Sequence, residues 1–343
     1  MTTSPSLNTL FLPLEQGLIG ARTPVLFLGA GWNPYLSAIK EHVHCWQPFF
    51  PAAEKLRVLG FEILDDIPES GAYGLVLIDL PKQVEEAQFW LAQGLKLCAP
   101  DGMVSACAPN DANGNRIQKW MAELDMETES ESKNKAKVVW GKRPQSKPAI
   151  LDEWLEFGGL QELESDEGHM FVSQPGLFGW SKIDQGSALL ADEMITPLAG
   201  VGADFGCGYG YLSQRILEKN VGIETLLLID ADSRAIACAE ENLINVQGGR
   251  TIQYYWADLS QKIDGLPPLD FIVMNPPFHI GKSTDPMLGQ SFIKTASHHL
   301  KKGGKLWMVA NAHLPYEKTL KDNFKTVRVV IEKEGFKIFE AIA

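Results

Sequence analysis

The sequence lacks any long hydrophobic run. None of its apolar stretches approaches the roughly 20 consecutive residues that a membrane-spanning helix requires, so we expect no membrane segment. The first residues, Met1 to Asn8, are polar and contain no basic stretch of the kind that opens a secretory signal peptide. Both absences predict a cytoplasmic protein that meets no membrane.

Cysteine is scarce and follows no pattern. Five cysteines are scattered along the chain, and no two of them form a C-x-x-C pair. This arrangement indicates neither a disulfide framework nor a zinc site. A reducing compartment is the simplest setting for such a chain, and we expect no bound metal.

Positive charge is also in short supply, since 31 Lys and Arg residues stand against 43 Asp and Glu residues, for a formal net charge of −12. That balance argues against a general nucleic-acid-binding protein. Residues 132–150 are the exception, because they contain no acid and several bases: Lys133, Lys135, Lys137, Lys142, Arg143 and Lys147. The stretch could contact phosphates, or it could be an edge strand whose lysines oppose unwanted strand pairing. The sequence leaves both open.

What the sequence does contain is an alternating α/β pattern. With 45% hydrophobic and 22% charged residues it is typical of a globular protein, and 343 residues are enough for two domains. Short apolar runs alternate with helical periodicities over residues 24–140 and again from residue 201, which predicts two mostly parallel sheets. Residues 326–331 and 336–342 predict a final antiparallel hairpin. We place the domain boundary between residues 148 and 149.

The two halves of the chain resemble each other. Val25–Gly31 parallels Ala203–Gly208, and Leu75–Lys82 parallels Phe271–Phe278. This predicts a duplicated domain, although any two doubly wound domains share such strand-and-turn patterns. Residues 1–148 lack the Asn-Pro-Pro-Phe element and the full glycine run described next. We therefore expect a degenerate first domain with a structural or substrate-binding role, and a catalytic domain in residues 149–343.

The most informative stretch is the apolar run that ends in Asn275-Pro276-Pro277-Phe278. Proline cannot donate a ladder hydrogen bond, so the strand must stop there. The Asn275 oxygen and the Pro276 carbonyl can accept both hydrogens of an exocyclic amine, while Phe278 stacks on the planar base. The alternative is an ordinary strand-ending turn, which Asn-Pro often begins.

A second motif lies upstream, at a predicted strand-to-helix junction. Asp204 precedes a loop with Gly206, Gly208 and Gly210, and glycines there allow a tight turn and close approach of a ligand to the backbone. Three glycines alone are a weak signal, shared with nicotinamide and flavin sites. The acid decides between them, because it would repel a pyrophosphate but can bind the cationic amino-acid end of S-adenosylmethionine.

Two further acids end the following predicted strands. Asp230 could accept both ribose hydroxyls, and Asp258 could accept an adenine amine. Each acid alone could be an ordinary polar residue at a strand end. Together with Asp204 they follow the carboxyl edge along which such sheets bind ligands, which favours a cofactor site.

These motifs carry a family resemblance. Residues 171–343 resemble a class I S-adenosylmethionine-dependent methyltransferase, with Asn275 to Phe278 matching the Asn/Asp-Pro-Pro-aromatic motif of amino-group methylating enzymes. Phe278 in place of Tyr resembles the guanine-N2 methyltransferases of ribosomal RNA. With Pro175–Phe178 and Val309–Tyr316 added, the chain is similar to the bacterial 16S ribosomal RNA guanine-N2 methyltransferase C family, and its large-subunit relative is close.

The resemblance implies two tandem Rossmann-like class I methyltransferase domains, each mostly parallel, with a C-terminal antiparallel hairpin. It implies S-adenosylmethionine as cofactor, and ribosomal RNA or the 30S subunit as partner. The catalytic residues would be Asn275, Pro276, Pro277 and Phe278, and the cofactor-binding residues Phe178, Asp204, Gly206, Cys207, Gly208, Gly210, Asp230, Ala231, Asp258 and Asn275.

The implied reaction is direct methyl transfer to a guanine amine that the protein holds in line with the activated methyl group. Other targets remain open: a guanine of 23S ribosomal RNA, a DNA adenine or a protein glutamine. An inactive fold that only binds ribosomes is the non-enzymatic alternative. The oligomeric state also stays open, with a monomer as the simplest expectation.

Overall fold

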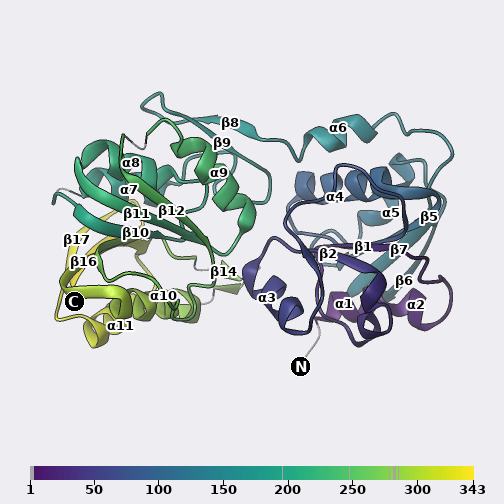
Figure 1. Ribbon diagram of the computed structural model, residues 1–343, viewed down its shortest axis with the longest axis horizontal. Coiled ribbons are helices and arrows are strands. Elements are labelled where there is room, and N and C mark those ends of the chain that lie inside the picture. Colours follow the sequence, from purple (N-terminus) through teal and green to yellow (C-terminus); the bar gives the residue numbers. More distant parts are fainter. Residues whose placement is uncertain (1–3, 195, 247, 278, 281–282, 285) are drawn as a thin grey trace. The chain divides into compact units, whose positions relative to one another are not determined.

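The computed structural model describes residues 4–194, 196–246, 248–277, 279–280, 283–284 and 286–343. It forms two compact units (Figure 1). The first runs to Gly159 and includes Gln174–Gly176; the second contains Leu160–Ser173 and the chain from Leu177. The expected boundary at residues 148/149 falls before α6 (Leu151–Glu156), which packs on α4 (Val84–Leu97) and so belongs with the first unit.

The first unit is built on a seven-stranded sheet in the order β3-β2-β1-β4-β5-β7-β6. Five strands are parallel: β1 (Val25–Leu28), β2 (Val43–Trp46), β3 (Ile63–Leu64), β4 (Tyr73–Asp79) and β5 (Cys98–Pro109). The hairpin of β6 (Thr128–Lys133) and β7 (Ala136–Lys142) joins antiparallel. The remaining helices are α1 (Pro5–Leu10), α2 (Leu12–Glu15), α3 (Phe50–Val58), α5 (Ile117–Glu123) and the short 3₁₀ turns η1 (Pro34–Ala38) and η2 (Lys40–His42).

The second unit repeats this plan, in the order β12-β11-β10-β13-β16-β18-β17. Its parallel strands are β10 (Ala199–Phe205), β11 (Gly222–Asp230), β12 (Thr251–Trp256), β13 (Leu269–Met274) and β16 (Leu300–Asn311), followed by the hairpin of β17 (Thr326–Lys333) and β18 (Phe336–Ile342). Short antiparallel pairs are β8 (Gln161–Glu164) with β9 (Met170–Ser173) and β14 (His279–Ile280) with β15 (Ser283–Thr284). The helices are α7 (Gln185–Glu193), α8 (Tyr211–Lys219), α9 (Ser233–Leu243), α10 (Pro286–His299) and α11 (Tyr316–Asn323).

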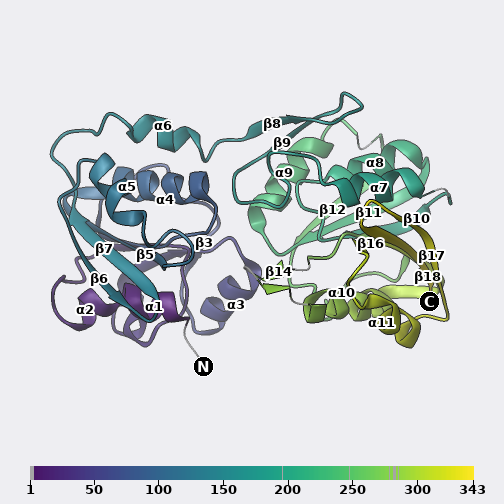
Figure 2. The same ribbon diagram turned by 180° about the vertical axis from the view of Figure 1, so that it is seen from behind.

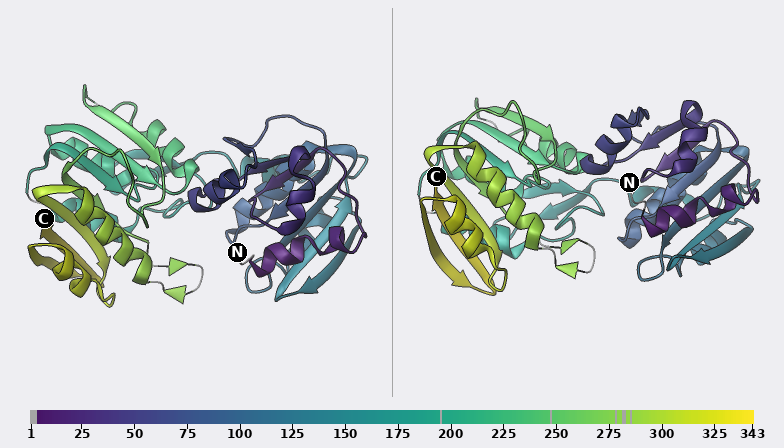
Figure 3. Two further views of the ribbon diagram at one scale, coloured as in Figure 1. Left: turned by 60° about the horizontal axis from the view of Figure 1, so that its bottom comes forward. Right: turned by 90° about the horizontal axis from the view of Figure 1, so that it is seen from below.

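Helices cover both faces of each sheet. In the second unit α7, α8 and α9 pack on one face and α10 and α11 on the other (Figure 2). Figure 3 shows the yellow-green helices α10 and α11 side by side on their face. Strands buried on both faces must be apolar throughout, which is why β1 reads as four consecutive hydrophobic residues. The predicted fold, two tandem Rossmann-like domains with a C-terminal antiparallel hairpin, is confirmed.

The two sheets correspond residue by residue. Leu28 of β1 pairs with Ile78 of β4, just as Phe205 of β10 pairs with Met274 of β13. The residue after Ile78 is Asp79, so Asp79 is the counterpart of Asn275. Strand order and register together support the duplication that the sequence predicted.

The basic stretch of the first unit lies on the β6–β7 hairpin and the segment after it. β6 is the outermost strand of the sheet, and the hairpin turns at Asn134 and Lys135, both with positive φ. Lys137 donates a hydrogen bond to Gln118 on α5. Of its bases, Lys133 lies on the edge strand β6, whereas Lys137 and Lys142 lie on β7 inside the sheet. The edge-strand interpretation is therefore wrong for most of the stretch, and contact with phosphates stays a prediction.

Candidate active site

A glycine loop follows β10 at the carboxyl edge of the second sheet. Gly206, Gly208 and Gly210 adopt φ values of 76°, 53° and 89°, in the left-handed region that favours glycine. A Cβ on Gly210 would lie 3.2 Å from Ala239 of α9, so this glycine permits close helix packing. A Cβ on Gly208 would meet nothing within 4 Å, so the loop has open space beside its backbone there.

Asp204 lies at the end of β10, fully buried beneath this loop. Its Oδ2 accepts a 2.6 Å hydrogen bond from the Ser213 hydroxyl, whereas its Oδ1 is buried without a partner among the described residues. Desolvation raises the pKa of Asp204 to about 7, against the hydrogen bond from Ser213 and helped by the nearby charge of Asp230. An unpartnered buried carboxylate oxygen is suited to a cationic group on a ligand.

Asp230, at the end of β11, organises the loop from the other side. Its Oδ2 accepts the N–H of Gly208 at 2.8 Å, and its Oδ1 accepts the N–H of Asp232 at 2.9 Å. Desolvation raises the pKa of Asp230 to about 6, with the hydrogen bonds from Asp232 and Gly208 opposing the shift. Sequence reasoning missed this contact with the loop, because backbone donors leave no residue-type signal.

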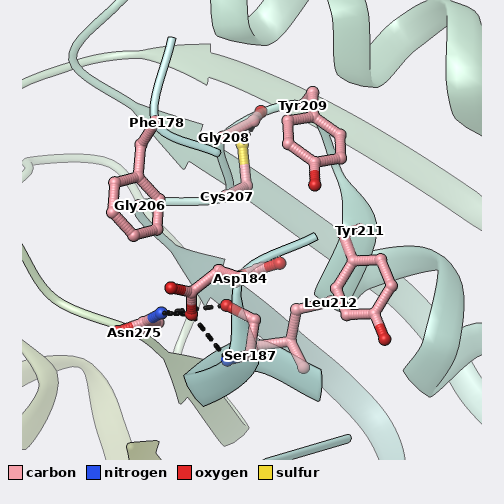
Figure 4. A pocket seen from close by; sticks show the side chains of 11 residues that line it. Phe178, Asp184, Ser187, Gly206, Cys207, Gly208, Tyr209, Tyr211, Leu212 and Asn275 are labelled. Carbon is pink, nitrogen blue, oxygen red and sulfur yellow. Dashed lines mark hydrogen bonds between the residues drawn. The ribbon is translucent and has the colours of Figure 1, made fainter. Parts of the chain in front are cut away.

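Asn275 follows β13 and faces the N-terminus of α7. Its Nδ2 donates to Asp184 Oδ2 at 2.8 Å and to Ser187 Oγ at 2.9 Å (Figure 4). The same Asp184 oxygen accepts the Ser187 N–H at 2.8 Å, which makes Asp184 the N-cap of α7. The carboxamide therefore turns its NH2 group towards α7 and its oxygen away from it.

One pocket joins these parts. It opens to solvent, and the empty space within it, open solvent included, is about 430 Å³. It is lined by Phe178, Asp184, Ser187, Asp204, Gly206, Cys207, Gly208, Tyr209, Tyr211, Leu212 and Asn275 (Figure 4). Burial, with the charges of Asp230 and Asp204, raises the pKa of the Cys207 thiol well above its usual range, so Cys207 is a neutral lining residue.

Six of the thirteen predicted site residues thus converge. Phe178, Asp204, Gly206, Cys207, Gly208 and Asn275 share the pocket, and Phe178 is largely exposed at its mouth. Gly210, Asp230, Ala231, Asp258, Pro276 and Pro277 do not line it among the described residues. The predicted stacking residue Phe278 lies outside the described residues.

The carboxyl edge of the second sheet continues past Asp230 to the end of β12. Trp256 donates its indole N–H to the Ala231 carbonyl at 2.9 Å, joining the ends of β11 and β12. Asp258 accepts the N–H of Ser260 at 2.8 Å, so it closes its own turn. Its contact with an adenine amine stays a prediction.

Sequence reasoning missed Asp184 and Ser187, which stand at the start of α7. An Asp three residues before a Ser at a helix N-terminus indicates a helix cap. A cap does not reveal that the same Asp184 carboxylate also accepts a hydrogen bond from Asn275, 91 residues away. The described residues contain no group of three or more His, Cys, Asp or Glu that could hold a metal ion. Nor do they contain a helix long and apolar enough to cross a bilayer.

Comparison with known proteins identifies the family of this chain. The family model described as "Methyltransferase small domain" matches residues 168–340. The ribosomal RNA small subunit methyltransferase C of Pseudomonas aeruginosa (strain UCBPP-PA14) is 30% identical over 322 residues, 93% of this chain and 94% of the relative. That of Aeromonas hydrophila is 30% identical over 287 residues, 82% and 81%. The chain belongs to the ribosomal RNA small subunit methyltransferase C family.

A solved structure extends the likeness across both units. A T. thermophilus 16S rRNA N2 G1207 methyltransferase, in complex with AdoMet and guanosine, superposes with a TM-score of 0.82. The match covers 99% of this chain and 92% of that one at 19% identity, so it supports the fold. The family resemblance read from the two sequence motifs is confirmed.

Proposed function

We propose that this protein transfers a methyl group from S-adenosylmethionine to the exocyclic N2 amine of a guanine in 16S ribosomal RNA. The observation that carries the proposal is a single pocket that holds both the Asp204 carboxylate and the Asn275 carboxamide. Family membership supports the same reaction class. The T. thermophilus relative, named for N2 of a 16S rRNA guanine, supports the choice of target.

The pocket suits the cofactor at two points. The unpartnered Oδ1 of Asp204 can accept the ammonium end of S-adenosylmethionine, and the open face of Gly208 lets a ligand approach the loop backbone. Asp230 and Ala231 are the candidates for contacts with the ribose and adenine groups of the cofactor. The bound cofactor supplies a methyl group already activated on its sulfonium.

The chain itself has to hold and orient the amine. The Asn275 oxygen and the Pro276 carbonyl accept its two hydrogens, which turns the nitrogen lone pair towards the methyl group. Pro276 and Pro277 have no N–H, so no backbone donor of theirs competes for these acceptors. A guanine in folded RNA must first leave its stack, and stacking on Phe278 would offset part of that energy.

Label transfer tests the proposal. Purified protein is incubated with methyl-labelled S-adenosylmethionine and, separately, 30S subunits, free 16S RNA, 50S subunits, DNA or bulk protein. Label in 30S subunits or 16S RNA, recovered as N2-methylguanosine after nuclease digestion, is expected. Label found only in 50S subunits, DNA or protein would reject the 16S assignment and favour the corresponding alternative target.

The Asn275→Ala variant tests the role of the carboxamide. We expect it to bind the cofactor as the wild type does and to lose at least about 100-fold in turnover, because the amine is no longer oriented. Calorimetry with the cofactor and single-turnover methylation measure the two properties separately. Turnover at the wild-type rate would remove Asn275 from the mechanism.

A further inference from the structure

The carboxamide of Asn275 has two nearly isosteric ends, and only one suits methyl transfer. If the oxygen faces the guanine amine it accepts a hydrogen bond, whereas the NH2 group would set donor against donor. For a carboxamide free in water, the two orientations have similar free energies. Neighbouring groups in the protein therefore have to fix one of them.

We propose that Asp184 and Ser187 are positioning residues that make this choice, an inference that rests on the proposed function. Both lie within hydrogen-bond distance of Asn275 Nδ2, at 2.8 and 2.9 Å. Turning the carboxamide over would press its oxygen against the Asp184 carboxylate, two acceptors in contact. A charge-assisted bond from the NH2 group replaces that repulsion when the oxygen faces the pocket.

Asp184 is itself held in place by the helix that it caps. Its Oδ2 accepts the Ser187 N–H at 2.8 Å, and this bond fixes the oxygen that Asn275 also uses. Helix geometry therefore sets the acceptor before any substrate arrives. The Ser187 hydroxyl is a second acceptor on the first turn of the same helix.

The first unit contains an internal comparison. Its α1 also precedes the first parallel strand and is capped by a side chain, since Ser4 Oγ accepts the Leu7 N–H at 3.2 Å. Counted from the caps, Leu7 stands where the second unit has Ser187. Asp79 stands where it has Asn275. The helix and its cap persist there without a carboxamide, and the hydroxyl of Ser6 on α1 hydrogen-bonds the Asp79 carboxyl instead.

The first test is Ser187→Ala. The higher helix propensity of alanine offsets part of the lost hydrogen bond with Asn275, so a purely structural role predicts at most a small change in stability and unchanged activity. We expect unchanged stability and cofactor affinity, with kcat on 30S subunits lowered about tenfold by the lost hydrogen bond. Ser297→Ala is the matched control, because that helical hydroxyl donates to the Lys294 carbonyl of its own helix and, among the described residues, to no group of the pocket. Its kcat should equal that of the wild type.

The second test exchanges the two polar groups. Asn275→Asp alone places two carboxylates within hydrogen-bond distance and should lose at least about 100-fold in kcat. The double variant Asp184→Asn/Asn275→Asp restores an amide-to-carboxylate hydrogen bond and still presents an acceptor oxygen to the pocket. We expect it to recover at least about tenfold over Asn275→Asp.

The outcomes separate the two proposals. A wild type that methylates 16S RNA, with Ser187→Ala equally fast or no recovery in the double variant, overturns the positioning role and leaves the proposed function standing. A wild type that transfers no methyl group to RNA overturns both. A lower kcat with unchanged cofactor affinity, together with rescue by the exchange, supports the positioning role.

Discussion

Asp204→Asn should make the protein more stable at alkaline pH while weakening its cofactor site. The wild-type carboxyl is fully buried, and desolvation raises its pKa from 3.8 to about 7. A group with a raised pKa in the folded state contributes stability at low pH. This contribution is lost as the pH rises through the folded pKa. The amide cannot ionise, so the variant does not suffer this loss.

The size of the effect follows from the pKa shift. Between about pH 5 and pH 7 the unfolded carboxyl is ionised while the folded one keeps its proton, and each pH unit then removes about 1.4 kcal/mol of stability. Over these two units the wild type loses about 2 to 3 kcal/mol relative to the variant. Constant effects of the substitution, such as altered packing, cancel when the two pH values are compared.

Urea unfolding at about pH 5 and about pH 8 measures this change, without cofactor, for wild type and variant side by side. Asp270→Asn is a control, because the pKa shift of Asp270 has the opposite sign to that of Asp204. Despite some desolvation, hydrogen bonds from Lys301 and from the Val201 N–H lower the pKa of Asp270. Its contribution is fully present above the unfolded pKa of about 3.8 and is lost only as the pH falls below that value, so the stability deficit of that variant should be equal at pH 5 and pH 8. A stability difference for Asp204→Asn that stays constant from pH 5 to pH 8 would refute the buried-proton argument.

Two further predictions concern the cofactor. If Asp204 pairs with its ammonium group, affinity for S-adenosylmethionine measured by calorimetry should weaken as the pH falls below about 7, where the carboxyl gains a proton; a flat profile would place the ammonium elsewhere. Asp230→Ala should also weaken cofactor affinity, because the Gly208 N–H loses the acceptor that shapes the loop. Unchanged affinity would show that neither the loop nor the ribose depends on Asp230.

Sequence reasoning predicted well wherever the signal is local. Apolar residues recur at helical spacing between Val84 and Leu97, within the predicted α/β region, and the structure has α4 over these residues. The prolines after Asn275 marked the end of β13, and the glycines after Asp204 marked a turn into α8. Each of these features depends on the chemistry of neighbouring residues.

The contacts that organise the site could not be predicted in this way. Asn275 and Asp184 are 91 residues apart, and the fold alone brings them together. Asp230 ends its strand as expected, yet its carboxylate is engaged by the backbone of Gly208, which any residue could have supplied. Asp258 lies two residues past the end of β12, where it accepts the N–H of Ser260 in its own turn.

The comparison of the two units shows what separates a methyltransferase scaffold from a methyltransferase site. In the first unit the position of Gly208 is taken by Gly31, where a Cβ would lie 2.5 Å from the Leu7 side chain of α1. The corresponding space at Gly208 is open. A cofactor that approaches the loop backbone would therefore meet Leu7 in the first unit and free space in the second. Asp79 stands at the strand end where the second unit has Asn275, so the first unit has neither the open space at this glycine nor a carboxamide beside it. Under the proposed function, the first unit keeps the strand order but lacks the groups that would hold the cofactor and the amine.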